Sequence, residues 1–241
     1  MTRAPQLLER IHRRYQTLTE TVRIHGYSFP FVRVADPDRV LDQVAEEEDR
    51  LERLSGRRVN ADQLHLPYWA ELWDSAQGIA QWLARGASQR PGDGRAWDVL
   101  DLGCGMGLSG TVAARLGHRV LFADLEPPAL LFARLNSLPD ARRVRTRRLD
   151  WRTDRLGERF DLIIGADILY ERKQWDHLEP FWRAHLKSGG TVLLGEPGRQ
   201  TGDLFQPWIR QRGWAMHLVT ESVPTRPTPI RLMLLRLHPS E

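Results

Sequence analysis

Two patterns of apolar and polar residues divide this chain at the break PGDG, residues 91–94. After the break, apolar runs of strand length alternate with segments of helical periodicity, and runs such as DLIIGA and VLLG lack strict polar alternation. Such runs are typical of strands covered on both faces, and their alternation with helices indicates successive βαβ units. We expect parallel strands in WDVLDL, HRVLFAD, VRTRRL, FDLIIGAD and GTVLLGE, with helices over 106–117, 127–137 and 171–187.

The end of the chain follows a different pattern. GWAMHLVTE and IRLMLLRL are strand-like runs joined by VPTRPTP, which is too short for a crossover helix. One of these two strands must therefore run antiparallel to the others. The predicted fold class is α/β: a doubly wound, mostly parallel seven-stranded sheet of Rossmann-like type, with an antiparallel terminal hairpin and an N-terminal helical extension.

The early residues predict this extension over 1–64, made of helices and a short strand, ahead of a main domain over 65–241. Residues 1–25 predict a helix. YSFPFVRV, which begins at Tyr27, predicts a strand at a sheet edge, because Pro30 has no backbone N–H to donate.

A second helix of the extension has signals at both ends. Asp36 followed by Pro37 predicts its start, and Gly56 predicts its end. An apolar stripe from Val40 to Leu54 predicts a packed face. A further helix is expected over Ala70–Ala84.

Composition excludes several classes of protein. The single cysteine, Cys104, rules out an internal disulfide and a cysteine-built metal site, and we expect no bound metal. No stretch approaches the roughly 20 apolar residues of a membrane span. The start MTRAPQLLERIHRRY has charges where a signal peptide needs an apolar run. We therefore expect a soluble, cytoplasmic, monomeric protein with no membrane partner.

The net charge of +4 is partly local, since residues 134–159 contain nine arginines against four acids. Such a patch can contact RNA or an acidic protein face, or it can be a solvated loop region. Aromatic residues that could stack bases are not interleaved with the arginines, so a nucleic-acid partner is not favoured.

Candidate chemistry begins at DLGCGMG, residues 101–107, a glycine loop between a predicted strand and a predicted helix. Glycines let the backbone approach a ligand closely, and the helix N-terminus favours electron-rich groups. Gly105-x-Gly107-x-x-Gly110 fits the dinucleotide fingerprint, whereas Asp101-x-Gly103-x-Gly105-x-Gly107 fits the loop of S-adenosylmethionine (SAM) enzymes. The loop alone does not choose between the two cofactors.

The surroundings of the loop favour SAM. Asp101, under the bound cofactor, would repel a pyrophosphate and attract the cationic methionine end of SAM. Asp124 ends the next strand, and its carboxylate can accept hydrogen bonds from both ribose hydroxyls of either cofactor. The adjacent Leu125 is also part of the predicted cofactor site. The antiparallel terminal hairpin is typical of SAM methyltransferases, by fold analogy alone. NAD and a structural loop without cofactor remain the alternatives.

With these residues identified, the chain resembles the class I, seven-β-strand methyltransferases, and more narrowly the family 16 group, which includes many protein-lysine methyltransferases. The resemblance covers residues 65–200 and rests on LPYWAELWDSAQGIA, VLDLGCGMG, LFADLEP, RLDW, GADILYE and LLGEPGR. The acid–x–x–aromatic motif of family 16 falls on Asp167 and Tyr170. GEPGR is similar to the subgroup acting on the electron-transfer flavoprotein β subunit. WAELWDSA, however, lacks the glycine pair expected after the second tryptophan, so the substrate does not carry over.

Methyl transfer from a sulfonium needs alignment, dehydration and a neutral nucleophile. A lysine must lose its proton first, since its reference pKa is about 10.4. Asp167, at the carboxyl end of a strand, can hydrogen-bond the incoming amine, and Tyr170 can flank that amine by a cation–π contact. Asp167 also belongs to the predicted cofactor-binding residues. The alternatives are a helix cap for Asp167 and plain packing for Tyr170.

Further residues complete the predicted site. The family resemblance implies that Trp73 lines the SAM site, with Trp69 on the substrate side; otherwise both anchor a helix in the core. Asp150 follows the third strand and can accept the adenine amino group, while the backbone N–H of Trp151 faces the ring or its side chain forms a lid. Glu196 and Arg199, beyond the strand GTVLLGE, lie at the substrate edge and are candidates for the site, although a structural turn is the favoured role.

The favoured function is thus SAM-dependent methylation of a lysine side chain in a protein. Methylases of bases and of glutamine commonly carry Asn-Pro-Pro-aromatic where this chain has Asp-Ile-Leu-Tyr, which disfavours an amide or base acceptor. A methyltransferase for a small-molecule amine or an RNA is the alternative, and a non-catalytic nucleotide-binding module is the third hypothesis.

Overall fold

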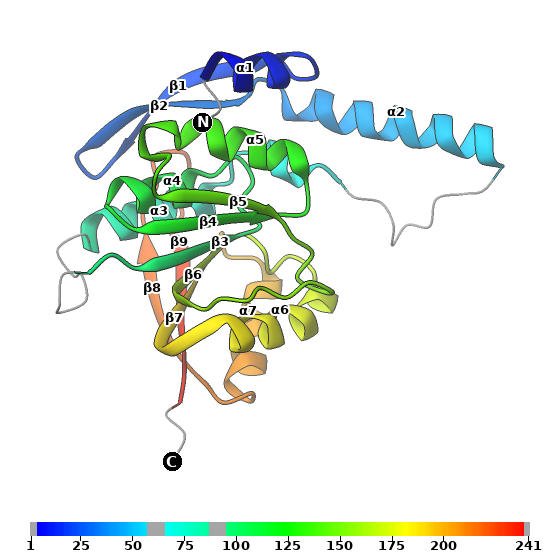
Figure 1. The fold of residues 1–241 in the computed structure, drawn as a ribbon. Coiled ribbons are helices and arrows are strands. Elements are labelled where there is room, and N and C mark those ends of the chain that lie inside the picture. The colour runs from blue at the N-terminus through cyan, green and yellow to red at the C-terminus, as the bar shows by residue number, and fades with distance from the viewer. Residues whose placement is uncertain (1–3, 57–65, 87–94, 239–241) are drawn as a thin grey trace.

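A computed structural model describes residues 4–56, 66–86 and 95–238 of the chain. The main body contains one sheet whose strands are β3 (Asp98–Leu102), β4 (Arg119–Asp124), β5 (Val144–Arg148), β6 (Phe160–Ala166), β7 (Leu186–Glu196), β8 (Trp214–Glu221) and β9 (Ile230–Leu237). Their order is β5-β4-β3-β6-β7-β9-β8, and β9 pairs antiparallel with both β7 and β8 while the other pairs are parallel (Figure 1). The predicted fold class and terminal hairpin are confirmed.

Helices cover both faces of this sheet (Figure 1). They are α3 (Asp74–Arg85), α4 (Leu108–Arg115) and α5 (Pro127–Asn136) on one face, and α6 (Arg172–His185) and α7 (Gln200–Arg210) on the other. Successive strand residues enter opposite cores, as Val99 and Leu100 of β3 do, which explains why the strand sequences lack polar alternation. The sequence interpretation missed α7.

The N-terminal extension begins with α1 (Ala4–His12), followed by a hairpin of β1 (Thr17–Ile24) and β2 (Tyr27–Val34). The helix predicted over 1–25 is therefore wrong beyond His12. The β-branched residues of TLTETVRI favour a strand, and His25 and Gly26 both have positive φ, as a tight hairpin turn requires. β2 is the strand predicted from Tyr27, and its only sheet partner among the described residues is β1.

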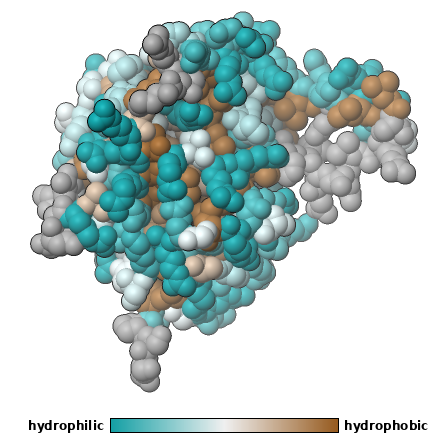
Figure 2. Space-filling model, in the orientation of Figure 1, coloured by the Kyte–Doolittle hydropathy of each residue, from teal (hydrophilic) through white to brown (hydrophobic). Residues whose placement is uncertain are grey.

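Helix α2 (Pro37–Ser55) has the predicted ends, because the Asp36 carboxylate accepts the Arg39 N–H and Gly56 is left-handed. Its apolar stripe does not pack as expected. Val40 is buried, whereas Leu51 and Leu54 are exposed. The helix projects from the body, and brown apolar side chains are visible on its surface (Figures 1 and 2). Within the described residues, the contact of α2 with the body is therefore concentrated near its N-terminal end.

Asn136, at the end of α5, fastens the hairpin to the body. Its amide oxygen accepts the Val32 N–H at 2.8 Å, and its amide nitrogen donates to the Val32 carbonyl at 2.9 Å. The same nitrogen donates to the Met106 carbonyl at 3.0 Å, in the glycine loop. One side chain thus ties the extension to the segment expected to hold a cofactor.

The helix predicted over Ala70–Ala84 begins later than expected. A short 3₁₀ turn, η2 (Tyr68–Ala70), precedes an extended Trp73, and α3 starts at Asp74. The predicted boundary between residues 64 and 65 and the PGDG break lie outside the described residues. No helix in the described ranges is long and apolar enough to cross a membrane.

Gly107 should be among the least replaceable residues of the fold. It has φ +85°, and an added Cβ would lie 2.7 Å from the Cβ of Ala133 on α5. We expect Gly107→Ala to lower the free energy of unfolding by about 2–5 kcal/mol, through left-handed strain and overpacking. Urea denaturation would measure this loss.

Gly213→Ala is the matched control, because Gly213 has φ +79° and no atom within 4 Å of an added Cβ. Gly213→Ala should lower the free energy of unfolding by the left-handed strain alone, about 1–2 kcal/mol. Equal losses in the two variants would show that the contact with Ala133 contributes nothing.

Candidate active site

The carboxyl ends of β3, β4, β5 and β6 open into one cavity with about 1070 Å³ of empty space, its open mouth included. Ligands of open α/β sheets bind at this edge. The sequence-predicted residues that line it are Trp73, Gly103, Gly105, Gly107, Asp124, Leu125, Asp150, Trp151, Asp167 and Tyr170. The structure thus brings together residues far apart in the sequence, while their binding roles stay predictions.

The glycine loop forms one wall of the cavity. Gly103, Gly105 and Gly107 all have positive φ, and Gly107 caps the N-terminus of α4. The Gly103 N–H donates to the Ala123 carbonyl of β4 at 2.8 Å, which holds the loop against the neighbouring strand. At these three glycines the loop therefore presents backbone rather than side chains to the cavity.

Asp101 is the one predicted cofactor residue that does not line the cavity. Its carboxylate lies beneath the loop and accepts the Gly110 N–H of α4 at 2.9 Å. Burial raises the pKa of Asp101 to about 8, and the charge of Asp124 adds to this rise. A carboxyl with that pKa is largely protonated at neutral pH, so other acids must supply the negative charge of the cavity.

Asp124 ends β4 at the cavity wall and is 8% exposed. Its Oδ2 accepts the Gly105 N–H at 2.9 Å, and its Oδ1 accepts the Glu126 N–H at 2.9 Å. Burial raises its pKa to about 6, although these two backbone N–H groups lower it. Each oxygen keeps a second acceptor site, so the carboxylate is fixed in place and can still bind two hydroxyls.

Asp150 and Trp151 form the far side of the cavity, after β5. The Asp150 carboxylate makes an ion pair with Arg152 at 2.7 Å. The Trp151 indole N–H donates to the amide oxygen of Gln174 on α6 at 3.0 Å, which fixes the ring against the cavity. The side chain of Trp151 therefore forms a wall, as the lid hypothesis expects.

Asp167 occupies the opposite corner, immediately after β6, and is 8% exposed. It is a non-glycine residue with φ +57°, a left-handed conformation that suggests a functional constraint. Its N–H donates to the Gly195 carbonyl of β7 at 2.8 Å. Its Oδ2 accepts a hydrogen bond from Arg199 at 2.8 Å. Burial raises the pKa of Asp167, and Arg199 opposes the rise.

Three aromatic rings surround this corner. Tyr68 lies edge-on to Tyr170 with ring centroids 5.2 Å apart, and edge-on to Trp73 at 6.3 Å. The Trp73 indole N–H donates to the Tyr68 carbonyl at 2.9 Å. Burial raises the pKa of Tyr170 to about 12, so its phenol stays neutral. Aromatic faces beside a carboxylate can receive an amine or an ammonium group.

The position of Trp69 agrees with both roles that the sequence left open, and its role on the substrate side stays a prediction. It lines the cavity, and it is buried against Tyr15 and Phe132 with ring centroids 5.2 Å and 5.9 Å away. Tyr15 belongs to the N-terminal extension, so this aromatic contact connects the extension to the cavity wall.

Sequence reasoning missed several lining residues, notably Tyr68, Glu126 and Gln174. Glu126 lies two residues beyond Asp124, and Tyr68 adjoins the tryptophan segment, so both carried a local signal. Gln174 lies on α6 and meets Trp151 only through tertiary packing. No sequence spacing indicated that contact.

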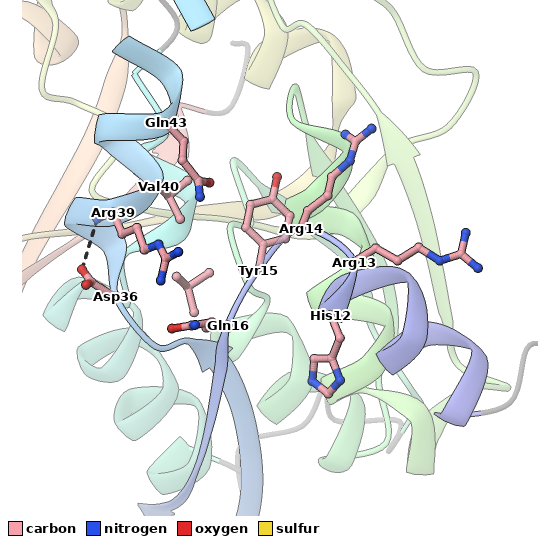
Figure 3. A pocket seen from close by; sticks show the side chains of 10 residues that line it. His12, Arg13, Arg14, Tyr15, Gln16, Asp36, Arg39, Val40 and Gln43 are labelled. Carbon is pink, nitrogen blue, oxygen red and sulfur yellow. Dashed lines mark hydrogen bonds between the residues drawn. The ribbon is translucent and has the colours of Figure 1, made fainter. Parts of the chain in front are cut away.

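A smaller cavity, with about 480 Å³ of empty space including its open mouth, lies between the end of α1, the loop that follows it and the first turns of α2 (Figure 3). Arg39 and Gln16 point into it, whereas Arg13 extends away (Figure 3). These three side chains are exposed, and no buried polar group converges there among the described residues. The cavity at the strand ends is therefore the candidate active site.

Comparison with known proteins matches the segment of the chain that lines this cavity. Residues 62–204 match a protein family described as lysine methyltransferase. The electron transfer flavoprotein beta subunit lysine methyltransferase of Danio rerio is 34% identical over 140 residues, or 55% of this chain and 51% of that protein. The protein N-lysine methyltransferase METTL21A of Danio rerio is 35% identical over 150 residues, or 57% of this chain and 64% of the relative. The matched segments thus span between about half and two thirds of these relatives' length.

Solved structures share the fold. Ribosomal protein L11 methylase from Lactobacillus delbrueckii subsp. bulgaricus has a TM-score of 0.55 at 20% identity, covering 70% of this chain and 81% of that one. The glycopeptide N-methyltransferase MtfA complexed with S-adenosyl-L-methionine has a TM-score of 0.54 at 17% identity, covering 67% and 88%. At these identities the likeness concerns the fold alone.

Proposed function

The chain belongs to the lysine methyltransferase family, and from this premise we propose that it transfers a methyl group from SAM to a lysine side chain of a protein. The observation that carries the proposal is a single cavity with Asp124 on one wall and the Asp167–Tyr170 corner on another. Such a cavity can hold a cofactor and an acceptor side by side.

The charge of the lining supports SAM rather than NAD. Among the described lining residues, the acids are Glu71, Asp124, Glu126, Asp150 and Asp167. The basic residue among them, Arg152, is already paired with Asp150 at 2.7 Å. An acidic cavity disfavours a pyrophosphate and favours a cation. This choice no longer depends on Asp101.

Each part of the cavity has a proposed task. Asp124 would accept the ribose hydroxyls, Asp150 and Trp151 would hold the adenine, and the loop at Gly103–Gly105 would receive the methionine end. When bound, SAM supplies an electrophilic methyl group carried on a sulfonium. The fixed carboxylate of Asp124 and the bare backbone of the loop fit these groups.

The acceptor corner would align the lysine. Asp167 would accept an amine N–H and so direct the nitrogen lone pair toward the cavity. The rings of Tyr68, Trp73 and Tyr170 would exclude water and keep favourable contact with the charge that develops on nitrogen. None of these residues needs to act as a strong base, because the amine proton can leave to solvent beforehand.

The arginine-rich segment gives little support to an RNA substrate. Arg145 pairs with Glu158 at 2.7 Å, and Arg148 donates to the Leu125 carbonyl at 3.0 Å. Both arginines belong to β5, which is an edge strand of the sheet, and charged side chains on an edge strand hinder pairing with a further strand. A structural role thus accounts for part of the cluster in residues 134–159.

Incubation of the purified protein with a cell lysate and methyl-labelled SAM tests the proposed function. We expect label in a discrete protein band, with mass spectrometry placing the methyl group on a lysine. Nuclease-sensitive label would select an RNA substrate instead, and label in the small-molecule fraction would select a free amine. Failure of SAM to bind in calorimetry would select the non-catalytic alternative.

A further inference from the structure

Arg199 contacts two residues of the acceptor corner without lining the cavity itself. Its Nη2 lies 2.8 Å from Oδ2 of Asp167, and its guanidinium carbon lies 5.6 Å from the centroid of the Trp73 ring. The guanidinium therefore joins the acid proposed to orient the amine to an aromatic wall of the same site.

The turn that carries Arg199 is held firmly. The N–H groups of Gly198 and Arg199 donate to Oε2 of Glu196 at 2.7 Å and 2.9 Å. The Arg199 carbonyl accepts from Arg231 at 3.1 Å, and Arg231 also makes an ion pair with Glu196. Since the backbone is fixed on both sides, Arg199 is pre-organised against Asp167 and does not act as a mobile gate.

The charge of Arg199 matters because Asp167 is buried. Burial raises the pKa of Asp167, and the charge of Glu196 raises it further. The guanidinium of Arg199 lowers this pKa by its charge and by its hydrogen bond, and the charge of Arg226 also lowers it. These charged groups lie at the end of β7, at the N-cap of α7 (Gln200–Arg210) and in the loop before β9. The phenol of Tyr170 faces the same corner but stays neutral.

An uncompensated carboxylate would be a poor partner for a methyl acceptor. A lone negative charge raises the pKa of a bound lysine and keeps it as an ammonium, which has no lone pair to attack with. Paired with Arg199, Asp167 can still accept a hydrogen bond through Oδ1. The net charge of the Asp167–Arg199 pair is then close to zero.

Resting on the proposed function, we propose that Arg199 is a positioning residue of the methyl-transfer site. It aligns the Asp167 carboxylate and compensates its charge, so that the lysine acceptor is held as the neutral amine.

The test replaces Arg199 by glutamine, by methionine and by lysine. Met keeps an unbranched apolar side chain without the charge, and Lys restores the charge without the planar fork. The rate of methylation of the labelled lysate protein is measured between about pH 6 and pH 10. The active form needs an ionised Asp167 and a neutral amine. We therefore expect Arg199→Gln and Arg199→Met to shift the rising limb of the pH–rate profile to higher pH, by about one unit or more.

On the acid side of the rising limb, the Arg199→Gln and Arg199→Met variants should methylate about tenfold more slowly than the parent protein. At the alkaline end of the profile, their rates should approach the parent rate. Arg199→Lys should return the profile toward the parent. Arg212→Gln is the matched control, because Arg212 stacks on Trp208 at 3.7 Å and pairs with Asp176 at 3.2 Å away from the cavity. Its profile should stay unchanged. A loss of rate equal at all pH values, or an unshifted limb, would overturn the proposal.

A second measurement needs no substrate and so separates this proposal from the proposed function. The carboxyl carbon of Asp167 can be titrated by NMR in ¹³C-labelled protein, with Asp167→Asn to assign the signal. We expect Arg199→Gln and Arg199→Met to raise the pKa of Asp167 by about one unit or more. An unchanged titration overturns the role of Arg199 even if the protein methylates lysine. Absence of methyl transfer by the parent protein would instead refute the proposed function.

Discussion

Asp167→Asn is expected to lower the rate of lysine methylation by about a hundredfold or more while SAM still binds with nearly the parent affinity. Asparagine keeps the size of the side chain and tolerates the left-handed backbone, φ +57°, so the fold should survive. It removes the charge-assisted bond to Arg199 at 2.8 Å and the acceptor proposed for the amine. The lysate labelling assay measures the rate, and calorimetry measures the affinity.

Asp176→Asn is the matched control for this experiment. Asp176 also pairs with an arginine, Arg212, but its side chain is 70% exposed and lies on α6 away from the cavity. Its labelling rate should not change. Parent-like labelling by Asp167→Asn would remove Asp167 from the acceptor site, and a parallel loss of SAM binding would assign it to the cofactor side.

Asp124→Ala is expected to weaken SAM binding by about a hundredfold or more. Hydrogen bonds to a charged group contribute about 1.5–3 kcal/mol each, and the ribose would lose two. The variant also releases the N–H groups of Gly105 and Glu126, which the carboxylate now holds at 2.9 Å. Calorimetry measures the effect. Asp42→Ala, on the exposed surface of α2, is the control and should bind SAM normally.

The pH dependence of SAM binding tests the same residue by another route. The pKa of Asp124 is raised to about 6 by burial, and the ionised form is the one that accepts both hydroxyls. Affinity should therefore be full above pH 6 and fall as the pH drops through that value, by up to about tenfold per unit. Asp124→Asn should show weak binding without this dependence. An identical pH dependence in the asparagine variant would mean that another group titrates.

The sequence determined the main sheet because its signals are local and repeated. Apolar runs such as DLIIGA are buried only when both faces of their strand are covered. The connection VPTRPTP is too short to contain the crossover helix that a parallel strand would need. The same locality explains why the loop at Gly103–Gly107 and the acids at the carboxyl ends of β4 and β6 could be identified. A parallel sheet brings all its carboxyl ends to one edge, so residues at strand ends meet without further information.

Tertiary structure decided what depends on contacts between distant elements. It determined whether the apolar stripe of α2 is covered, since an amphipathic pattern does not say what lies opposite it. It placed Asp101 beneath the loop, because Gly110 leaves room for the carboxylate to reach a helix N–H. It also joined Asp167 to Arg199, which lies 32 residues further along the chain. Period and spacing specify which way a side chain leaves its own element, whereas its partner is set by how the elements pack.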